Sequence, residues 1–161
     1  MADQNLGRAG ATSVAGWLQL LETRSGEHRI ALGLRRVAEV WQRLWGGRPF
    51  PHPVVTVTGT NGKGSTCAYL ETIYRAAGYR VGCYTSPHLL RYQERIRVNG
   101  VPVADYPLVA AFAAVEMARR EIPLTYFEHG TLAALWLFAQ EPLEVAILEV
   151  GIGGRLDAVN V

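Results

Sequence analysis

The sequence is nearly devoid of lysine and poor in cysteine. Of its 16 basic residues, 15 are arginine and one is a lysine, Lys63. The two cysteines, Cys67 and Cys83, form no Cys-x-x-Cys or Cys/His cluster, which excludes a disulfide framework and a structural zinc site. The absence of a long apolar run excludes a membrane span. The first twenty residues do not resemble a signal peptide, so we expect a cytoplasmic protein with no membrane partner.

Charge is also sparse and nearly balanced. Charged residues make up 19% of the chain, and the formal net charge is +2 at pH 7. So small an excess, carried by dispersed arginines, argues against a nucleic-acid partner. The 161 residues, 49% of them hydrophobic, are enough for one domain with a sizeable core and too few for two. We therefore expect one globular domain that acts on small molecules, in an oligomeric state that the sequence does not determine.

The order of the predicted elements favours an α/β fold. Residues 54–58 are β-branched and apolar, which is typical of a strand buried on both faces of a parallel sheet. A glycine-rich loop, a helix over about 65–77 and a second strand over 80–84 follow, and this β-α-β unit favours parallel pairing. Residues 145–150 predict a third buried strand. The fold class is thus a mostly parallel sheet with flanking helices.

The remaining patterns predict four helices and one hairpin. The helices are expected over 13–21, 34–44, 105–121 and 126–140. Alternating residues before Asn99-Gly100 predict the hairpin. In the second helix, Arg35, Arg36, Glu39 and Arg43 are expected to face solvent. We expect residues 1–50 to form a helical segment of the same domain, whose phosphate-binding part occupies residues 51–161.

The loop after the first strand has the composition of a phosphate-binding loop. It reads Gly59-Thr60-Asn61-Gly62-Lys63-Gly64-Ser65 and contains the single lysine. Glycines let backbone amides converge on an anion, and the start of the following helix carries partial positive charge. The ammonium of Lys63 would neutralise the β and γ phosphates of a nucleotide. The spacing is shorter than that of the standard phosphate loop.

Hydroxyl and carboxylate groups follow the other two predicted strands. Ser86 comes just after the second strand, and Glu149 lies at the end of the third. Carboxyl ends of parallel strands meet at one sheet edge, where such folds bind ligands. Hard oxygen donors suit Mg²⁺, which also retains waters and phosphate oxygens. His88 and His129 are candidate ligand contacts, although a histidine bonded within the protein is the commoner case.

Five segments, in chain order, resemble the folylpolyglutamate synthase and dihydrofolate synthase family of the Mur ligase superfamily. The first is the phosphate loop with its preceding strand, and the others are Thr85-Ser86-Pro87-His88-Leu89, Glu94-Arg95-Ile96, Leu124-Thr125-Tyr126-Phe127-Glu128 and Leu148-Glu149-Val150-Gly151-Ile152-Gly153-Gly154-Arg155-Leu156-Asp157-Ala158. The resemblance runs from about residue 33 to the last residue.

The resemblance implies an ATP-dependent ligase that converts a pteroate or folate carboxylate to an acyl phosphate, which the amine of glutamate then attacks. It implies that residues Gly59 to Ser65 bind ATP, with Lys63 as the catalytic cation, and that Ser65, Ser86 and Glu149 hold Mg²⁺. The residues implied to bind the pterin and pteroate are His88, Thr125, Tyr126, Phe127, Glu128, Leu156, Asp157 and Ala158. Among them, Tyr126 and Phe127 offer aromatic faces, and Glu128 and Asp157 offer acceptors for the N–H donors of a reduced pterin.

The extent of the resemblance leaves alternatives open. Members of the family are longer than this chain and carry further metal and glutamate-binding groups downstream. The chain therefore resembles a truncated ATP-binding domain without the glutamate-binding domain, and we expect it to be inactive as a ligase on its own. The alternatives are a cell-wall ligase of the Mur type and a truncated nucleotide-binding module without ligase activity.

Overall fold

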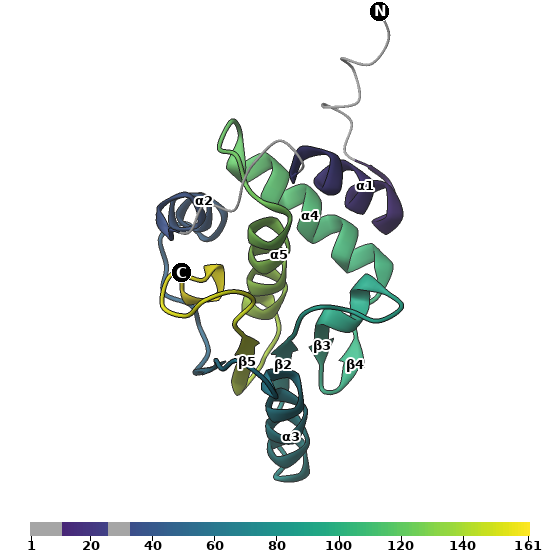
Figure 1. The fold of residues 1–161 in the computed structure, drawn as a ribbon, viewed down its shortest axis with the longest axis vertical. Coiled ribbons are helices and arrows are strands. Elements are labelled where there is room, and N and C mark those ends of the chain that lie inside the picture. The colour runs from purple at the N-terminus through teal and green to yellow at the C-terminus, as the bar shows by residue number, and fades with distance from the viewer. Residues whose placement is uncertain (1–10, 26–32) are drawn as a thin grey trace, which may run out of the picture.

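A mixed sheet of five strands forms the centre of the molecule (Figure 1). The computed structural model describes residues 11–25 and 33–161. The strand order is β1-β5-β2-β3-β4, with β1 (Val54–Val57) and β2 (Val81–Tyr84) parallel to β5 (Val145–Glu149), which lies between them. The hairpin of β3 (Ile96–Val98) and β4 (Val101–Pro102) adds to β2 in antiparallel sense. The expected α/β class is confirmed.

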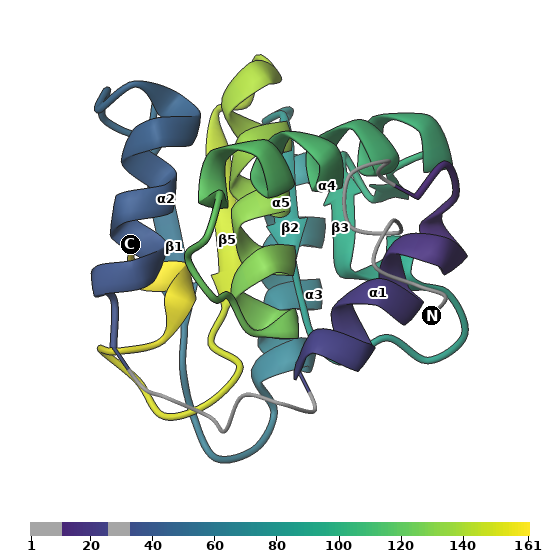
Figure 2. The same cartoon turned by 90° about the horizontal axis from the view of Figure 1, so that it is seen from above.

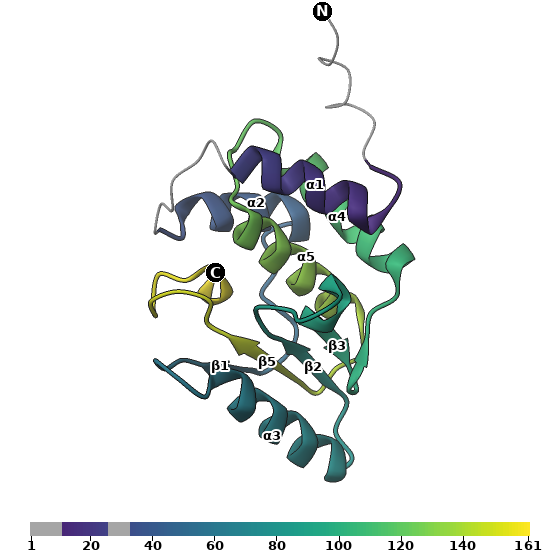
Figure 3. The same cartoon turned by 45° about the vertical axis from the view of Figure 1, so that its right-hand side comes forward.

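Helices cover both faces of the sheet unequally (Figures 2 and 3). One face packs against α3 alone and the other against α5, around which the remaining helices gather. The helices are α1 (Val14–Ser25), α2 (Arg35–Trp45), α3 (Lys63–Ala76), α4 (Asp105–Arg119) and α5 (Tyr126–Gln140), with short 3-10 turns η1 (Tyr92–Arg95) and η2 (Ala158–Asn160). Within the described ranges, none of the helices has both the length and the apolar character needed to cross a membrane.

The alternation of side chains along the central strands creates two cores. Val145 and Ile147 of β5 point to the α3 face with Cys67 and Cys83, whereas Leu148 points to the α5 face. The core on the α5 face is larger, because it also takes up the buried sides of α1, α2 and α4. The sheet therefore has a thin layer on one side and a thick helical layer on the other.

Most element boundaries agree with the sequence patterns. The first helix is an exception, because α1 ends at Ser25, four residues beyond the predicted end, and the burial of β1 also differs from the expectation. The Asn99-Gly100 turn has φ values of 51° and 77°, as a two-residue hairpin requires. The expectation that the first strand is buried on both faces is wrong. Since β1 forms the edge of the sheet and pairs with β5 only, Val54 is 44% exposed and Val57 alone is buried.

The start of α5 is fixed by a capping box and an ion pair. The Thr125 hydroxyl accepts from the N–H of Glu128, and the Glu128 carboxylate accepts from the N–H of Thr125 at 2.8 Å. Arg36 of α2 lies 2.7 Å from the same carboxylate. The expectation that Arg36 faces solvent is thus wrong, because its partner lies 92 positions away in sequence.

His129, expected as a possible ligand contact, is a core residue of α5. It is 1% exposed, its ring packs against Trp17 and Phe112, and its Nε2 lies 3.2 Å from the Phe112 carbonyl oxygen. Burial lowers the pKa of His129 from 6.5 to about 4. Glu116 is different, because hydrogen bonds from Arg119 and Arg24 outweigh its burial and lower its pKa to about 2.

We predict that His129 makes the protein acid-sensitive between pH 6.5 and pH 4. In this range the unfolded histidine is protonated and the folded one is neutral, so the free energy of unfolding falls as pH falls, by up to about 1.4 kcal/mol per pH unit. His129→Gln should flatten this dependence in urea unfolding at several pH values. Protonation of Glu116 also lowers the free energy of unfolding, but at lower pH, between 4.5 and about 2. An unchanged slope in the His129→Gln variant would contradict the prediction.

Candidate functional site

The glycine-rich loop joins β1 to the start of α3 and leaves that helix end open. Gly62 is the N-cap residue with φ +75°, in the left-handed region that favours glycine, and no side chain caps the helix. The first N–H groups of α3, from Lys63, Gly64 and Ser65, therefore have no intrahelical acceptor. Amides converging at a helix N-terminus form an anion-binding site. The helix begins at Lys63, two residues before the predicted start.

The ammonium of Lys63 lies over this loop. Its Nζ donates a hydrogen bond to the Gly59 carbonyl oxygen at 2.9 Å. That bond folds the side chain back across the loop, so the charge stands beside the helix N-terminus. A phosphate at this place would meet both the backbone amides and the ammonium.

A first cavity, of about 600 Å³, opens beside the N-terminus of α3. Ser65, Ser86 and Glu149 all line it, so the structure brings together the three residues expected to hold a metal. The Glu149 carboxylate is 4% exposed and accepts a hydrogen bond from the N–H of Ser86 at 2.9 Å. A Cβ atom on Gly64 would lie 3.8 Å from the Glu149 Oε1 atom, so this carboxylate directly adjoins the phosphate loop.

The donor set of this cavity fits Mg²⁺. One carboxylate and two hydroxyls are hard oxygen ligands, and Mg²⁺ takes the rest of its coordination from phosphates and water. The described parts of the chain hold no cluster of three or more His, Cys, Asp and Glu side chains suited to a metal. The ion would therefore depend on the nucleotide for part of its ligand shell.

An ion pair forms another part of the wall of the first cavity. Arg97 of β3 lies 2.9 Å from Glu71 of α3, and its guanidinium also donates to the Thr85 hydroxyl at 3.1 Å. Burial would lower the pKa of Arg97, but the bond to Glu71 outweighs it and the pKa is raised. The charge of this arginine is thus compensated within the protein.

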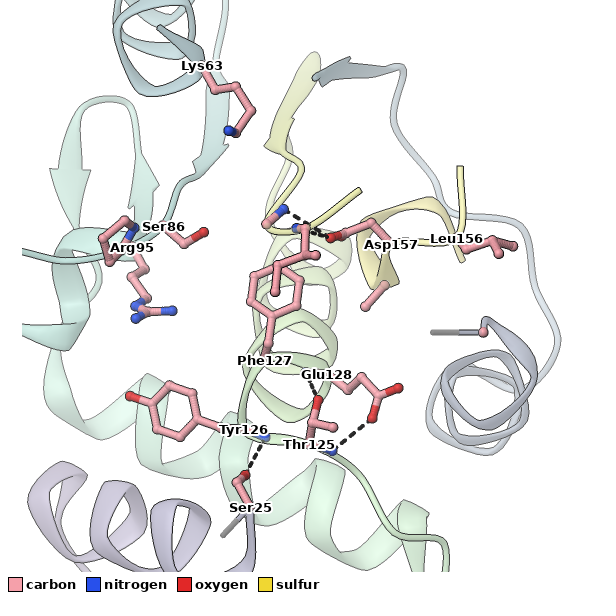
Figure 4. A pocket seen from close by; sticks show the side chains of 15 residues that line it. Ser25, Lys63, Ser86, Arg95, Thr125, Tyr126, Phe127, Glu128, Leu156 and Asp157 are labelled. Carbon is pink, nitrogen blue, oxygen red and sulfur yellow. Dashed lines mark hydrogen bonds between the residues drawn. The ribbon is translucent and has the colours of Figure 1, made fainter. Parts of the chain in front are cut away.

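A second cavity, of about 520 Å³, lies on the α5 side of the same sheet edge (Figure 4). Lys63 lines this cavity, and Ser86 and Pro87 line both cavities. Seven of the eight residues expected to bind the pteroate line it, namely Thr125, Tyr126, Phe127, Glu128, Leu156, Asp157 and Ala158. The two cavities therefore meet at Ser86, two residues after the end of β2.

Two carboxylates that line the second cavity already accept hydrogen bonds from other groups of the protein. Each Glu128 oxygen has a partner, the N–H of Thr125 or the guanidinium of Arg36. Asp157 accepts from the N–H groups of Gly151 and Ile152 with Oδ2 and from that of Val159 with Oδ1. Both carboxylates organise the walls of the cavity. Each keeps acceptor capacity beyond these bonds, so their role as acceptors for a pterin stays a prediction.

The eighth residue, His88, lies outside the second cavity. Its Nδ1 accepts a hydrogen bond from the Arg95 Nε atom at 2.9 Å, and its ring packs against Tyr92. It is Arg95, a residue given no role by the sequence analysis, that lines the cavity. The only sequence signal for it was its place in the Glu94-Arg95-Ile96 segment.

Buried phenols stand behind the cavity. Burial raises the pKa of Tyr84 to about 12 and that of Tyr92 well above its usual value, so both are neutral at pH 7. The Tyr84 hydroxyl accepts from Thr131 at 3.3 Å. These groups offer no base near neutral pH. The cavity is lined by two cations, Lys63 and Arg95, and by the two carboxylates already bonded within the protein, Glu128 and Asp157.

We predict that Asp157 holds the loop after β5 in place. Asp157→Ala removes three buried charge-assisted hydrogen bonds and should lower the free energy of unfolding by about 2–4 kcal/mol. The amide hydrogens of Gly151 and Ile152 should exchange faster with solvent, measured by hydrogen exchange. Asp157→Asn, which keeps one acceptor, should fall between. Unchanged protection of both amides in Asp157→Ala would refute this role.

The chain is similar to curated and solved dihydrofolate synthase/folylpolyglutamate synthases. No family model matches it. It is 56% identical over 151 residues to the dihydrofolate synthase/folylpolyglutamate synthase of Escherichia coli K12, covering 94% of this chain and 35% of that protein. The structure of E. coli FolC in complex with DHPP and ADP matches with a TM-score of 0.87 over 94% of this chain and 36% of that one, also at 56% identity.

A second solved structure gives the same result. A bifunctional folylpolyglutamate synthase/dihydrofolate synthase with Mn, AMPPNP and L-glutamate bound matches with a TM-score of 0.86 at 51% identity, over 96% of this chain and 37% of that one. The chain spans about 35% of the length of the curated relatives it matches. Over the residues that it spans, it belongs to the dihydrofolate synthase/folylpolyglutamate synthase family.

Proposed function

We propose that the protein is an ATP-dependent ligase that adds L-glutamate to dihydropteroate, to a folate, or to both. The observation that carries the proposal is the junction of the two cavities at Ser86, with Lys63 beside it. One cavity has the features of a phosphate and metal site, and the other has the aromatic and apolar walls of a site for a flat heterocycle. The matched structures hold ADP with DHPP, and AMPPNP with Mn and L-glutamate, which supports the proposal.

In this proposal the nucleotide phosphates bind to the loop from Gly59 to Ser65. The first amides of α3 and the Lys63 ammonium neutralise the β and γ phosphates. Ser65, Ser86 and Glu149 hold Mg²⁺, which when bound offsets further phosphate charge. Phe127 and Tyr126 contact the pteroyl rings, and Leu156 and Ala158 line the same cavity.

The first chemical step needs positioning more than proton transfer. An oxygen of the substrate carboxylate attacks the γ phosphorus, the bond from that phosphorus to the β–γ bridging oxygen breaks, and ADP leaves with the bond electrons. The carboxylate is already ionised at pH 7, so no base is required. The glutamate amine then attacks the acyl carbon, loses a proton and expels inorganic phosphate.

We propose further that the ligation requires residues beyond this chain and takes place in the cytoplasm, where ATP is available. The relatives are about three times as long, which supports a contribution from the rest of such a protein to glutamate binding. Holding the amine against the acyl phosphate accounts for roughly 7–11 kcal/mol of such a barrier. The cell-wall alternative is not favoured, since the relatives and structures reported above are folate enzymes.

The function is tested by assaying the complete protein with MgATP, dihydropteroate and glutamate, in the wild type and in two Lys63 variants. We expect formation of dihydrofolate, and a loss of roughly 100-fold or more in kcat for both Lys63→Ala and Lys63→Arg. A planar guanidinium cannot occupy the place of an ammonium that bends back to Gly59 within a tight loop.

Three results would count against this account. Near-normal activity of Lys63→Arg would refute the specific role of the ammonium. Turnover of a uridine-linked muropeptide, with none of dihydropteroate or a folate, would favour the cell-wall alternative. Binding of ATP without any ligation would reduce the protein to a nucleotide-binding module.

The backbone of Gly151 lies close to the Phe127 ring, so a side chain added at position 151 should narrow the second cavity. A Cβ atom on Gly151 would lie 2.6 Å from the Phe127 Cζ atom, so Gly151→Ala must displace the ring that lines the cavity. We expect the affinity for pteroate to fall about tenfold or more, measured by calorimetry on the complete protein. Gly154→Ala is the matched control, because its Cβ would meet nothing within 4 Å. Equal affinities in the two variants would argue against pteroate binding beside Phe127.

A further inference from the structure

Arg95 is a buried cation without an acidic partner. It is 9% exposed and lines the second cavity. Its Nε donates to the Nδ1 atom of His88, and among the described residues no carboxylate lies within 4.0 Å of its guanidinium. Arg36 and Arg97, by contrast, each pair with a buried glutamate at 2.7 and 2.9 Å. The charge of Arg95 is thus not compensated by the described part of the protein.

Three side chains fix the orientation of this guanidinium. The Nδ1 atom of His88 accepts from its Nε, and the rings of Tyr92 and Tyr126 lie 5.1 Å and 5.6 Å from its central carbon. Its two Nη nitrogens make no hydrogen bond within the described residues, and Figure 4 shows the guanidinium pointing into the cavity. A rigid fork of N–H donors is therefore presented to whatever binds there.

The nearby carboxylates do not accept hydrogen bonds from the Arg95 guanidinium. Glu128 is paired with Arg36, and Asp157 is hydrogen-bonded to the loop after β5. An unpaired charge on a largely buried side chain is costly, and an anion bound in the cavity would offset that cost. The phosphates of a nucleotide already have Lys63 and the amides of α3. The anion left for Arg95 is one that enters with the ligand of the second cavity.

We propose that Arg95 binds a carboxylate of the pteroyl substrate. The planar fork matches a carboxylate with two parallel hydrogen bonds, which a lysine at this place would not provide. Arg95 would hold either the carboxylate that is to be phosphorylated or, in a folate, the α-carboxylate of its glutamyl group. His88 acts as a positioning residue, since it touches Arg95 and not the cavity. This assignment rests on the proposed function.

The test compares ligands with and without the charge. Affinities of the complete protein for pteroate and for its carboxamide are measured by calorimetry in the wild type and in Arg95→Met. We expect the variant to bind pteroate about 10- to 100-fold more weakly and the carboxamide within about twofold of the wild type. A merely structural role of Arg95 would weaken both ligands alike. Folate and its α-carboxamide, compared in the same way, distinguish the two carboxylates.

Each outcome decides the assignment. If the variant no longer binds pteroate more tightly than its carboxamide, Arg95 is assigned to the reacting carboxylate. If the variant loses only the preference for folate over its α-carboxamide, Arg95 is assigned to the α-carboxylate. If Arg95→Met no longer binds the carboxamides, Arg95→Gln is used in its place, because the glutamine amide can still donate to His88. A full preference for both carboxylates in a variant that binds the carboxamides would overturn the inference. Failure of the wild type to bind pteroate would instead refute the proposed function, and the inference with it.

Discussion

The parallel pairing of β5 between β1 and β2 is the constraint on which the site depends. Its register sets Glu149 opposite Val57, the last residue of β1, and Leu148 opposite Tyr84, the last residue of β2. All three strands therefore end at the same level, and their loops meet at one edge. A slip of two residues would move Glu149 by about 6.6 Å along the strand, out of reach of the Ser86 amide.

The balance of charge at this edge depends on which carboxylates are already bonded to arginines or to backbone N–H groups within the fold. Glu71, Glu128 and Asp157 are buried, and each is bound to an arginine or to backbone N–H groups. Lys63 and Arg95 remain as cations facing the second cavity. An apolar, aromatic cavity with two cations suits a flat ligand that carries a negative charge, as the proposed pteroate substrate does.

Local patterns predicted the parts of the structure that local forces decide. The hairpin at Asn99-Gly100, the limits of α5 and the gathering of Ser65, Ser86 and Glu149 follow from turn chemistry, helical periodicity and the geometry of parallel strands. Seven of the eight residues that the resemblance assigns to pteroate line the second cavity and His88 does not, while their binding of pteroate stays a prediction.

What the sequence could not reveal depends on distant partners. The half-buried position of Arg36 depends on its ion pair with Glu128, and the limited burial of β1 reflects its place at the sheet edge. That Asp157 bonds to its own loop, and that Arg95 replaces His88 at the cavity, depend on side-chain directions that spacing does not fix. Such contacts arise only when the elements have packed, so single-sequence patterns do not report them.

The central claim is that this sheet edge brings a substrate carboxylate to the γ phosphate between the two cavities. The direct measurement is a crystal structure of the complete protein with pteroate, Mg²⁺ and a non-hydrolysable ATP analogue. The account predicts a carboxylate oxygen about 3–3.5 Å from the γ phosphorus, beside Lys63 and Ser86. Pteroate bound outside the cavity of Tyr126 and Phe127, or a carboxylate turned away from the phosphate, would contradict it.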